Sequence, residues 1–121
     1  MKPIEILNAL RQLTNVMEEE KKYLEISRKP KFSPEVAIAI VRNRKELEKE
    51  LDSIIEVEER NKKIAEKRGI PIEELEEQKE LMQTDIEIDI CYIADGDLKV
   101  CKDLSSLDFY ALSFMTKYEQ N

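Results

Sequence analysis

The residues best suited to chemistry lie in TDIEIDICYIADGD (84–97), where five carboxylates occupy fourteen positions. They are Asp85, Glu87, Asp89, Asp95 and Asp97. Carboxylates can bind a hard cation, transfer protons or form an acidic recognition surface. In an extended chain, alternate residues lie about 7 Å apart, which is too open to enclose Ca²⁺ at about 2.5 Å. A metal site here would therefore need ligands from elsewhere, and the order of acids and glycine does not match an EF-hand loop.

The same stretch has the pattern of a β-strand. Acidic residues and isoleucines alternate from Asp85 to Ile90, which predicts a strand with one apolar face. Asp95-Gly96 favours a two-residue hairpin turn, and in that register Cys91 and Cys101 lie on opposite faces. We therefore expect a β-hairpin whose solvated face carries the carboxylates and whose cysteines stay reduced. An acidic recognition surface is the main alternative.

A second candidate site is basic. Arg42, Arg44 and Lys45 lie in the stretch RNRK, and a second basic stretch, RKPK, occupies residues 28–31. If the helices fold back on each other, these cations could hold a nucleotide phosphate, because arginine presents a bidentate donor pair. The alternative is ion pairing with glutamates of neighbouring helices.

The composition argues against an enzyme. The chain of 121 residues contains no histidine, which removes the commonest general base and transition-metal ligand. Cys91 has no histidine to activate it, so a structural thiol is favoured over a nucleophile. A hydrolase that uses the carboxylate row is the least favoured possibility. We therefore predict no catalytic residues, no cofactor and no resident metal.

Apolar periodicity predicts four helices around this stretch. The first spans residues 3–26, and a second begins at Ser33-Pro34 and ends at Gly69. Its apolar stripe includes Ile40, Leu47, and either Ile54 or Ile55, and its first turns, VAIAIV, should be buried on several sides. Pro71 opens a third helix (71–83), and Ser105 with Asp108 fits a capping box for a final helix over 105–118. That helix should have an apolar face made of Leu107, Tyr110, Ala111, Phe114 and Met115.

These elements predict an α+β fold that is mostly α. We expect a long antiparallel helical hairpin (1–68), followed by a short helix, a small C-terminal β-hairpin and a closing helix (69–121), within a single domain (1–121). Since the second helix is longer than the first, a stripe that outruns its partner would favour a coiled coil or dimer.

The charge distribution limits the partners. The net charge is −7, and residues 85–121 alone carry −5, with eight acids and three lysines. Such a surface repels duplex DNA, so we expect no direct duplex nucleic-acid binding. The sequence shows no apolar run that could cross a bilayer and no signal-peptide pattern, so we expect an intracellular protein without membrane association.

Three stretches together resemble a protein family. They are the long helical sequence PEVAIAIVRNRKELEKELDSIIEVEERNKKIAEKRG, the strand-like LMQTDIEIDICYI and the closing LSSLDFYALSFM. This combination resembles small uncharacterised phage and prophage proteins of Gram-positive bacteria, over about residues 34–115. The resemblance implies a phage origin and a non-enzymatic helical protein that works in the host cell or in the phage particle, and it supplies no catalytic residues. Of these locations, we expect the host cytoplasm.

We therefore expect a helical protein-interaction module, oligomeric, whose partner is a second copy, a phage protein or a host protein. The alternative is an inhibitor of host antiviral defence. It would act as an acidic nucleic-acid mimic through the five carboxylates, or would sequester a small anionic nucleotide through Arg42, Arg44 and Lys45.

Overall fold

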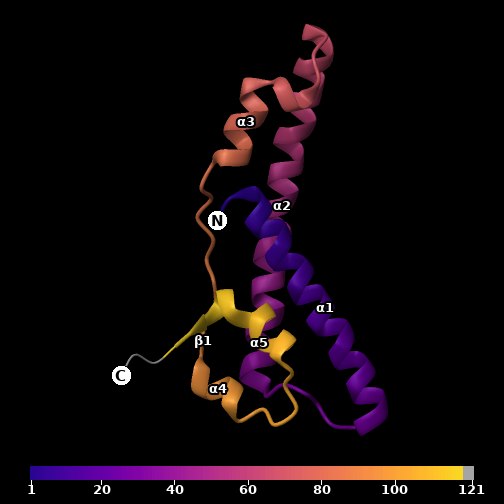
Figure 1. The fold of residues 1–121 in the computed structure, drawn as a ribbon, viewed down its shortest axis with the longest axis vertical. Coiled ribbons are helices and arrows are strands. Elements are labelled where there is room, and N and C mark those ends of the chain that lie inside the picture. The colour runs from indigo at the N-terminus through magenta and orange to yellow at the C-terminus, as the bar shows by residue number, and fades with distance from the viewer. Residues whose placement is uncertain (119–121) are drawn as a thin grey trace.

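Two long helices dominate the computed structural model, which describes residues 1–118. Helix α1 (Pro3–Ser27) and helix α2 (Pro34–Arg68) run in opposite directions and are joined by a short loop, as in a helical hairpin (Figure 1). Pro34 occupies the first turn of α2 as predicted, although the Ser33 side chain makes no capping hydrogen bond. Gly69 ends α2 in the left-handed conformation (φ 66°), and its amide donates to the carbonyls of Ala65 and Glu66.

The part of α2 that extends past α1 is covered by the same chain. A 3₁₀ turn, η1 (Ile72–Glu74), leads into α3 (Glu76–Gln83), which folds back beside α2 (Figure 1). Leu75 is fully buried there, as are Ala65 and Asn61 of α2. The predicted third helix is therefore divided in two. The part of α2 that was predicted to extend beyond the first helix therefore packs against η1 and α3 of the same chain.

The C-terminal part differs most from the prediction. Strand β1 (Ile93–Ala94) is followed by a short helix α4 (Asp95–Lys99), then by α5 (Ser106–Leu112), a 3₁₀ turn η2 (Ser113–Met115) and strand β2 (Thr116–Lys117). The two strands pair in parallel, with Ile93 opposite Thr116 and Ala94 opposite Lys117. The predicted β-hairpin is therefore wrong, because Asp95-Gly96 begins a helix instead of a turn.

The strand predicted for residues 85–90 is also absent, although its two faces are correct. Residues 84–92 form an extended segment that descends beside α2 from α3 to β1 (Figure 1). Ile86, Ile88 and Ile90 are half-buried against the core, while the acidic residues between them are exposed. The alternation with a period of two therefore indicates an extended chain with one exposed and one buried side. It does not indicate which segment forms hydrogen bonds with that chain.

The core lies between α1, α2 and the C-terminal elements. Its buried residues include Ile6, Leu13, Val36, Ile40, Leu47, Ile54, Ile93, Leu98, Leu112 and Met115. The first turns of α2 are less enclosed than predicted, since the Ile38 side chain is 51% exposed. The apolar face predicted for the final helix is corrected too, because Leu107 (76% exposed) and Tyr110 (69%) face outward. The Ser105–Asp108 capping box is confirmed, with both hydrogen bonds formed.

Candidate functional site

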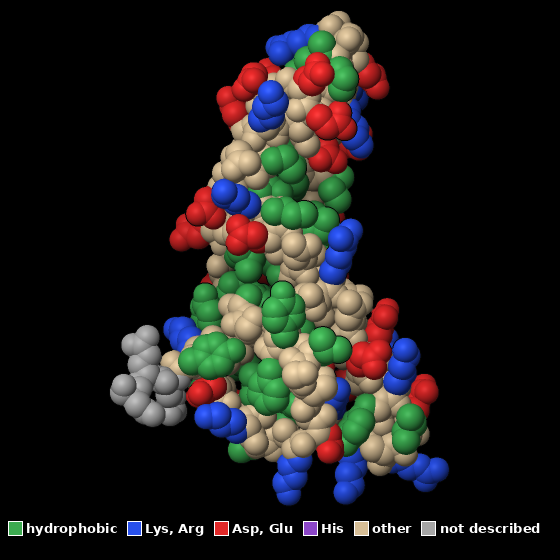
Figure 2. Space-filling model, in the orientation of Figure 1, with side chains coloured by type: hydrophobic (Ala, Val, Ile, Leu, Met, Phe, Trp, Pro, Cys, Tyr) green, Lys and Arg blue, Asp and Glu red, His purple; other side chains and the backbone are tan. Residues whose placement is uncertain are grey.

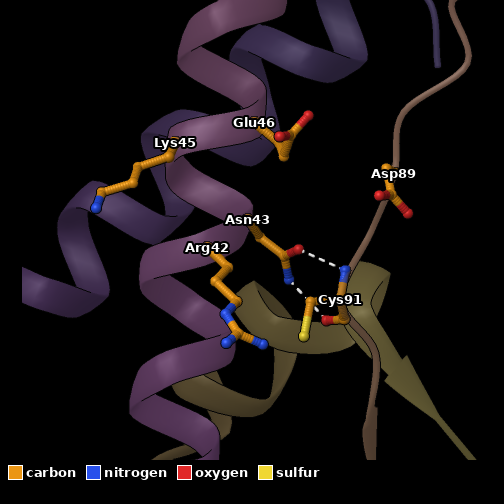
Figure 3. A pocket seen from close by; sticks show the side chains of 6 residues that line it. All are labelled: Arg42, Asn43, Lys45, Glu46, Asp89 and Cys91. Atoms are coloured by element: carbon orange, nitrogen blue, oxygen red, sulfur yellow. Dashed lines mark hydrogen bonds between the residues drawn. The ribbon is translucent and has the colours of Figure 1, made fainter.

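The extended segment 84–92 is fastened to α2 by one asparagine side chain. The Asn43 amide nitrogen donates to the Cys91 carbonyl at 2.8 Å, and its oxygen accepts from the Cys91 amide at 2.7 Å (Figure 3). The side chain thus replaces a neighbouring strand as the partner of one residue's backbone. The same nitrogen also lies 3.3 Å from the Met115 sulfur, and Asn43 is fully buried. This buried amide therefore joins α2, the extended segment and the C-terminal elements.

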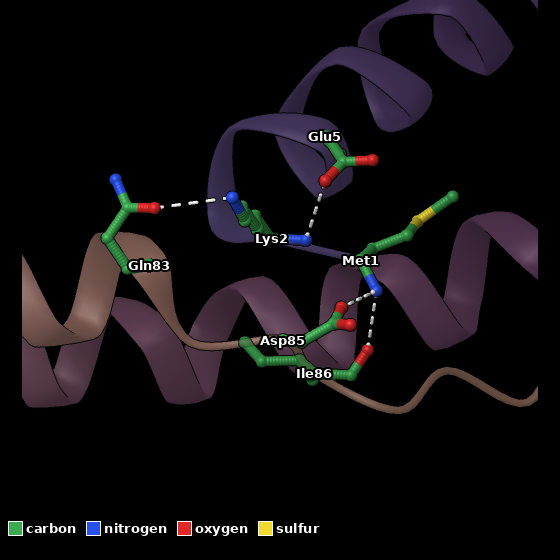
Figure 4. A network of polar contacts seen from close by, with 6 residues as sticks. All are labelled: Met1, Lys2, Glu5, Gln83, Asp85 and Ile86. Carbon is green, nitrogen blue, oxygen red and sulfur yellow. Dashed lines mark hydrogen bonds and ion pairs between the residues drawn. The ribbon is translucent and has the colours of Figure 1, made fainter.

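The other end of the segment is held by the first residues of the chain. The Met1 amino group donates to the Asp85 carboxylate and to the Ile86 carbonyl, both at 2.8 Å, and the Ile86 amide donates back to the Met1 carbonyl (Figure 4). Close by, the Lys2 ammonium donates to the Gln83 side chain. The hydrogen bond from the amino group, and then its charge, lower the pKa of Asp85 below its usual value.

The five predicted acidic residues do not form one site. Asp85, Glu87 and Asp89 lie on the exposed side of the extended segment. Asp97 caps α4, where its carboxylate accepts from the Ala94 amide, and Asp95 pairs with Lys99 at 3.5 Å. Only the first three therefore form a row. Among residues 1–118, no group of three or more histidine, cysteine or acidic side chains could hold a metal ion.

The three predicted anion-binding residues are divided between two surfaces. Arg42 and Lys45 line a hollow of about 330 Å³ beside the Asn43–Cys91 clamp, together with Glu46 and Asp89. Figure 3 shows the Lys45 side chain pointing away from that of Arg42. Arg44 lies on another face of α2, 3.4 Å from the Met17 sulfur of α1 and 3.7 Å from the Glu48 carboxylate. A helical turn of 3.6 residues explains the division, because residues two apart point in nearly opposite directions.

The second basic stretch does not join them. The Lys31 ammonium forms an ion pair with the Asp108 carboxylate at 2.6 Å, and both side chains are mostly buried. Lys29 and Lys31 line a different hollow, with Lys102 and Asp103 of the α4–α5 connection. The structure therefore uses Lys31 to join the α1–α2 loop to α5.

An apolar groove is the main feature that sequence reasoning missed. It lies where the start of α1, the middle of α2 and the end of α3 meet, and it has a volume of about 300 Å³. Its lining is Pro3, Ile4, Leu7, Leu51, Ile54, Ile55, Glu58 and Met82. Figure 2 shows hydrophobic side chains gathered in the part of the molecule where α1, α2 and α3 meet. Ile4 is 57% exposed and Ile55 is 46% exposed, while Ile54 is buried.

The signal for this groove was present in the sequence. Two adjacent isoleucines on a helix point about 100° apart, so a narrow apolar stripe that buries Ile54 leaves Ile55 at its edge. One of them had to remain outside or meet another partner.

Comparisons with protein-family models, with curated proteins and with solved structures found no match. In the described part of the chain, no helix combines the length and apolarity needed to cross a membrane.

Proposed function

We propose that this chain is a small, non-enzymatic helical protein-interaction module of phage origin that acts in the host cytoplasm and assembles with a protein partner. The phage origin and the location rest on the family resemblance of residues 34–115. The interaction role rests on the groove at the α1–α2–α3 junction.

The groove carries this proposal because it is apolar, concave and supported by the two longest helices. Ile4 and Ile55 expose about half of their side chains there, next to half-buried Leu7, Leu51 and Met82. A contiguous apolar depression bordered by charged residues is typical of a protein-interaction site, whereas isolated exposed apolar residues need no explanation. Rigid helices on three sides would let a partner bind without reorganising the fold.

The test is native mass spectrometry of the tagged chain purified from host cells. We expect a bound protein partner, which is a second copy, a phage protein or a host protein. Ile55→Glu should remove this partner, because it places a charge in the groove. Ile26→Glu is the matched control, since Ile26 is 87% exposed at the far end of α1. A monomer without partner in every sample would contradict the proposal.

The exposed carboxylate row supports a second candidate, an inhibitor of host antiviral defence that mimics nucleic acid. Asp85, Glu87 and Asp89 are exposed at alternate positions of an extended segment fixed at both ends. A regular row of charges on a fixed backbone could occupy a basic channel in place of phosphates. Charge reversal of these three residues should abolish inhibition of a host nucleic-acid-binding effector. Inhibition that survives the reversal would eliminate this candidate.

The nucleotide-binding version of this alternative has weaker support. Arg42 and Lys45 share a hollow, but Glu46 and Asp89 line it as well and would repel a phosphate. Calorimetry with cyclic and linear nucleotides tests it directly, and no heat of binding would remove it.

A further inference from the structure

The apolar groove borders a stretch of α2 whose charged side chains are all acidic. Residues 50–59 of α2, which contribute Leu51, Ile54, Ile55 and Glu58 to the lining, contain five carboxylates and no basic residue. These acids are Glu50, Asp52, Glu56, Glu58 and Glu59. The opposite wall, made of Pro3, Ile4 and Leu7 of α1 with Met82 of α3, is apolar. Of these acids, Glu58 lines the groove, and the others lie on the adjoining surface of α2.

Two of these acids are used within the fold. The Glu58 carboxylate accepts a hydrogen bond from the Gln78 amide at 3.0 Å, and Glu59 lies 3.3 Å from the Lys62 ammonium. Asp52 and Glu56 are exposed, and neither has an ion pair within residues 1–118. They are one helical turn apart, so they lie side by side on the exposed surface of α2, next in sequence to the lining residues Leu51 and Ile55. Their charges are available to a partner.

These acids disfavour a second copy of the chain as the occupant. A two-fold dimer that packed the α2 surfaces of two copies together would bring the acids face to face, and natural interfaces use such like-charge contacts to exclude partners. Residues 50–59 span about 15 Å, nearly three helical turns, which matches the contact length of a short helix.

We propose that the groove binds a basic amphipathic helix of a partner protein. Its apolar stripe, at spacings of three and four residues, would rest on Leu51, Ile55 and Leu7, and its flanking lysines or arginines would face Asp52 and Glu56. This inference rests on the proposed interaction function and adds the chemistry of the partner.

Two synthetic helical peptides of about four turns test the inference. Both carry the same leucine stripe, but one has lysine and the other glutamate at the flanking positions. Binding is measured by fluorescence anisotropy at moderate salt. We expect the lysine peptide to bind at least about tenfold more tightly than the glutamate peptide. Circular dichroism melting confirms that each protein variant is folded.

Protein variants then locate the binding. Ile55→Glu should weaken the lysine peptide about tenfold or more. Asp52→Lys combined with Glu56→Lys should reverse the preference toward the glutamate peptide. Glu18→Lys combined with Glu25→Lys changes the net charge equally on a distant part of α1, so it should leave the preference unchanged. Ile26→Glu should also leave binding unchanged.

Any of the following results would overturn the inference. The peptides could bind equally, or the control variants could have the same effect as the groove variants. Alternatively, sedimentation could show a dimer that Ile55→Glu dissociates and that competes with peptide, which would make a second copy the occupant. In that case, the proposed interaction function stands, but the proposal that the partner is a basic helix is wrong. The same conclusion follows if binding of a cellular partner depends on Ile55 but not on Asp52 and Glu56. If Ile55→Glu affects no association of any kind, both proposals fail.

Discussion

Asn43 and Asn61 occupy core positions of α2 that the heptad spacing assigns to apolar side chains. Asn61 continues the series Ile40, Leu47 and Ile54, and both asparagines are fully buried. A buried amide is costly unless it forms hydrogen bonds, so each one must have a partner from another segment. Asn61 donates to the Gln78 side chain of α3 at 3.0 Å, and Asn43 holds the Cys91 backbone. Each asparagine therefore fixes where a later segment docks.

We expect Asn43→Ala to lower the free energy of unfolding by about 2 kcal/mol, because it leaves the Cys91 amide and carbonyl without partners. Urea denaturation measures this loss, and hydrogen exchange should show faster exchange of the Cys91 amide. Asn15→Ala, at an exposed position of α1, is the control. Equal stability of the two variants would mean that water replaces the clamp without cost.

Tyr23 couples the end of α1 to the α4–α5 connection. Its hydroxyl donates to the Asp103 carboxylate, and this hydrogen bond, then burial, raise the pKa of Tyr23 above its usual value. A raised pKa in the folded state stabilises the fold below the ordinary pKa of tyrosine, and this contribution is lost as the pH rises through the raised value. We expect Tyr23→Phe to remove a step above the ordinary pKa of tyrosine from the ultraviolet titration of the tyrosines. Tyr110→Phe, which removes an exposed hydroxyl, should leave that step in place.

At the scale of elements, the extended segment 84–92 shows how one face can be fixed while the other remains free. Its isoleucines supply burial, and Met1 and Asn43 hold its ends. The acidic residues between them contribute solubility and keep a free backbone edge from pairing with other chains.

Neutralising Glu87 and Asp89, which form no ion pair within residues 1–118, should therefore have little effect on stability. We expect Glu87→Gln with Asp89→Asn to change the free energy of unfolding by less than about 1 kcal/mol, because exposed substitutions without specific contacts rarely matter. Ile88→Ala, on the packed face, should cost about 2 kcal/mol. Chemical denaturation compares the two proteins. The opposite order would show that the carboxylates have a structural role.

The Lys31–Asp108 pair joins two elements that are distant in sequence. Asp108→Ala should lower the free energy of unfolding by about 3 kcal/mol, because it leaves a mostly buried ammonium unpaired and removes the cap of α5. Lys22→Met, which breaks the exposed pair with Glu19, should cost at most about 1 kcal/mol. Thermal or urea denaturation measures the loss of stability in each variant. Similar losses in both variants would contradict the burial of the Lys31–Asp108 pair.

At the scale of the whole molecule, α2 is the axis on which the rest is arranged. Its 35 residues form a rod of about 52 Å, with α3 beside one end and the C-terminal elements beside the other (Figure 1). The apolar groove lies between these two groups, at the junction of α1, α2 and α3. The molecule is elongated, so most of its side chains are close to the surface.

Small-angle scattering should reflect this shape. A compact domain of this length has a radius of gyration of about 14 Å, and we expect a larger value for the monomer because α2 alone is a rod of about 52 Å. Dilution to the monomeric state controls for assembly. A monomer at or below the compact value would mean that the free end of α2 folds back.

The sequence alone was sufficient for the elements that depend on local chemistry. Helix boundaries at Pro34 and Gly69 and the capping box at Ser105 follow from backbone conformations that those residues favour. The exposed and buried faces of residues 85–90 also follow from the period of two. These features need no distant partner, so their signals lie within a few residues.

Only the tertiary structure decided what those elements contact. The alternation from Asp85 to Ile90 could not reveal which groups hold this segment, because a segment held by a hairpin strand and one held by Met1 and an asparagine side chain have the same alternation. Asp95-Gly96 fits a turn or the first turn of a helix, and the burial of Leu98 accompanies the helix. The groove forms because three helices meet at one point, and no local pattern specifies that meeting. Local propensities fix the shape of each segment, while the burial of apolar surface between distant segments fixes their arrangement.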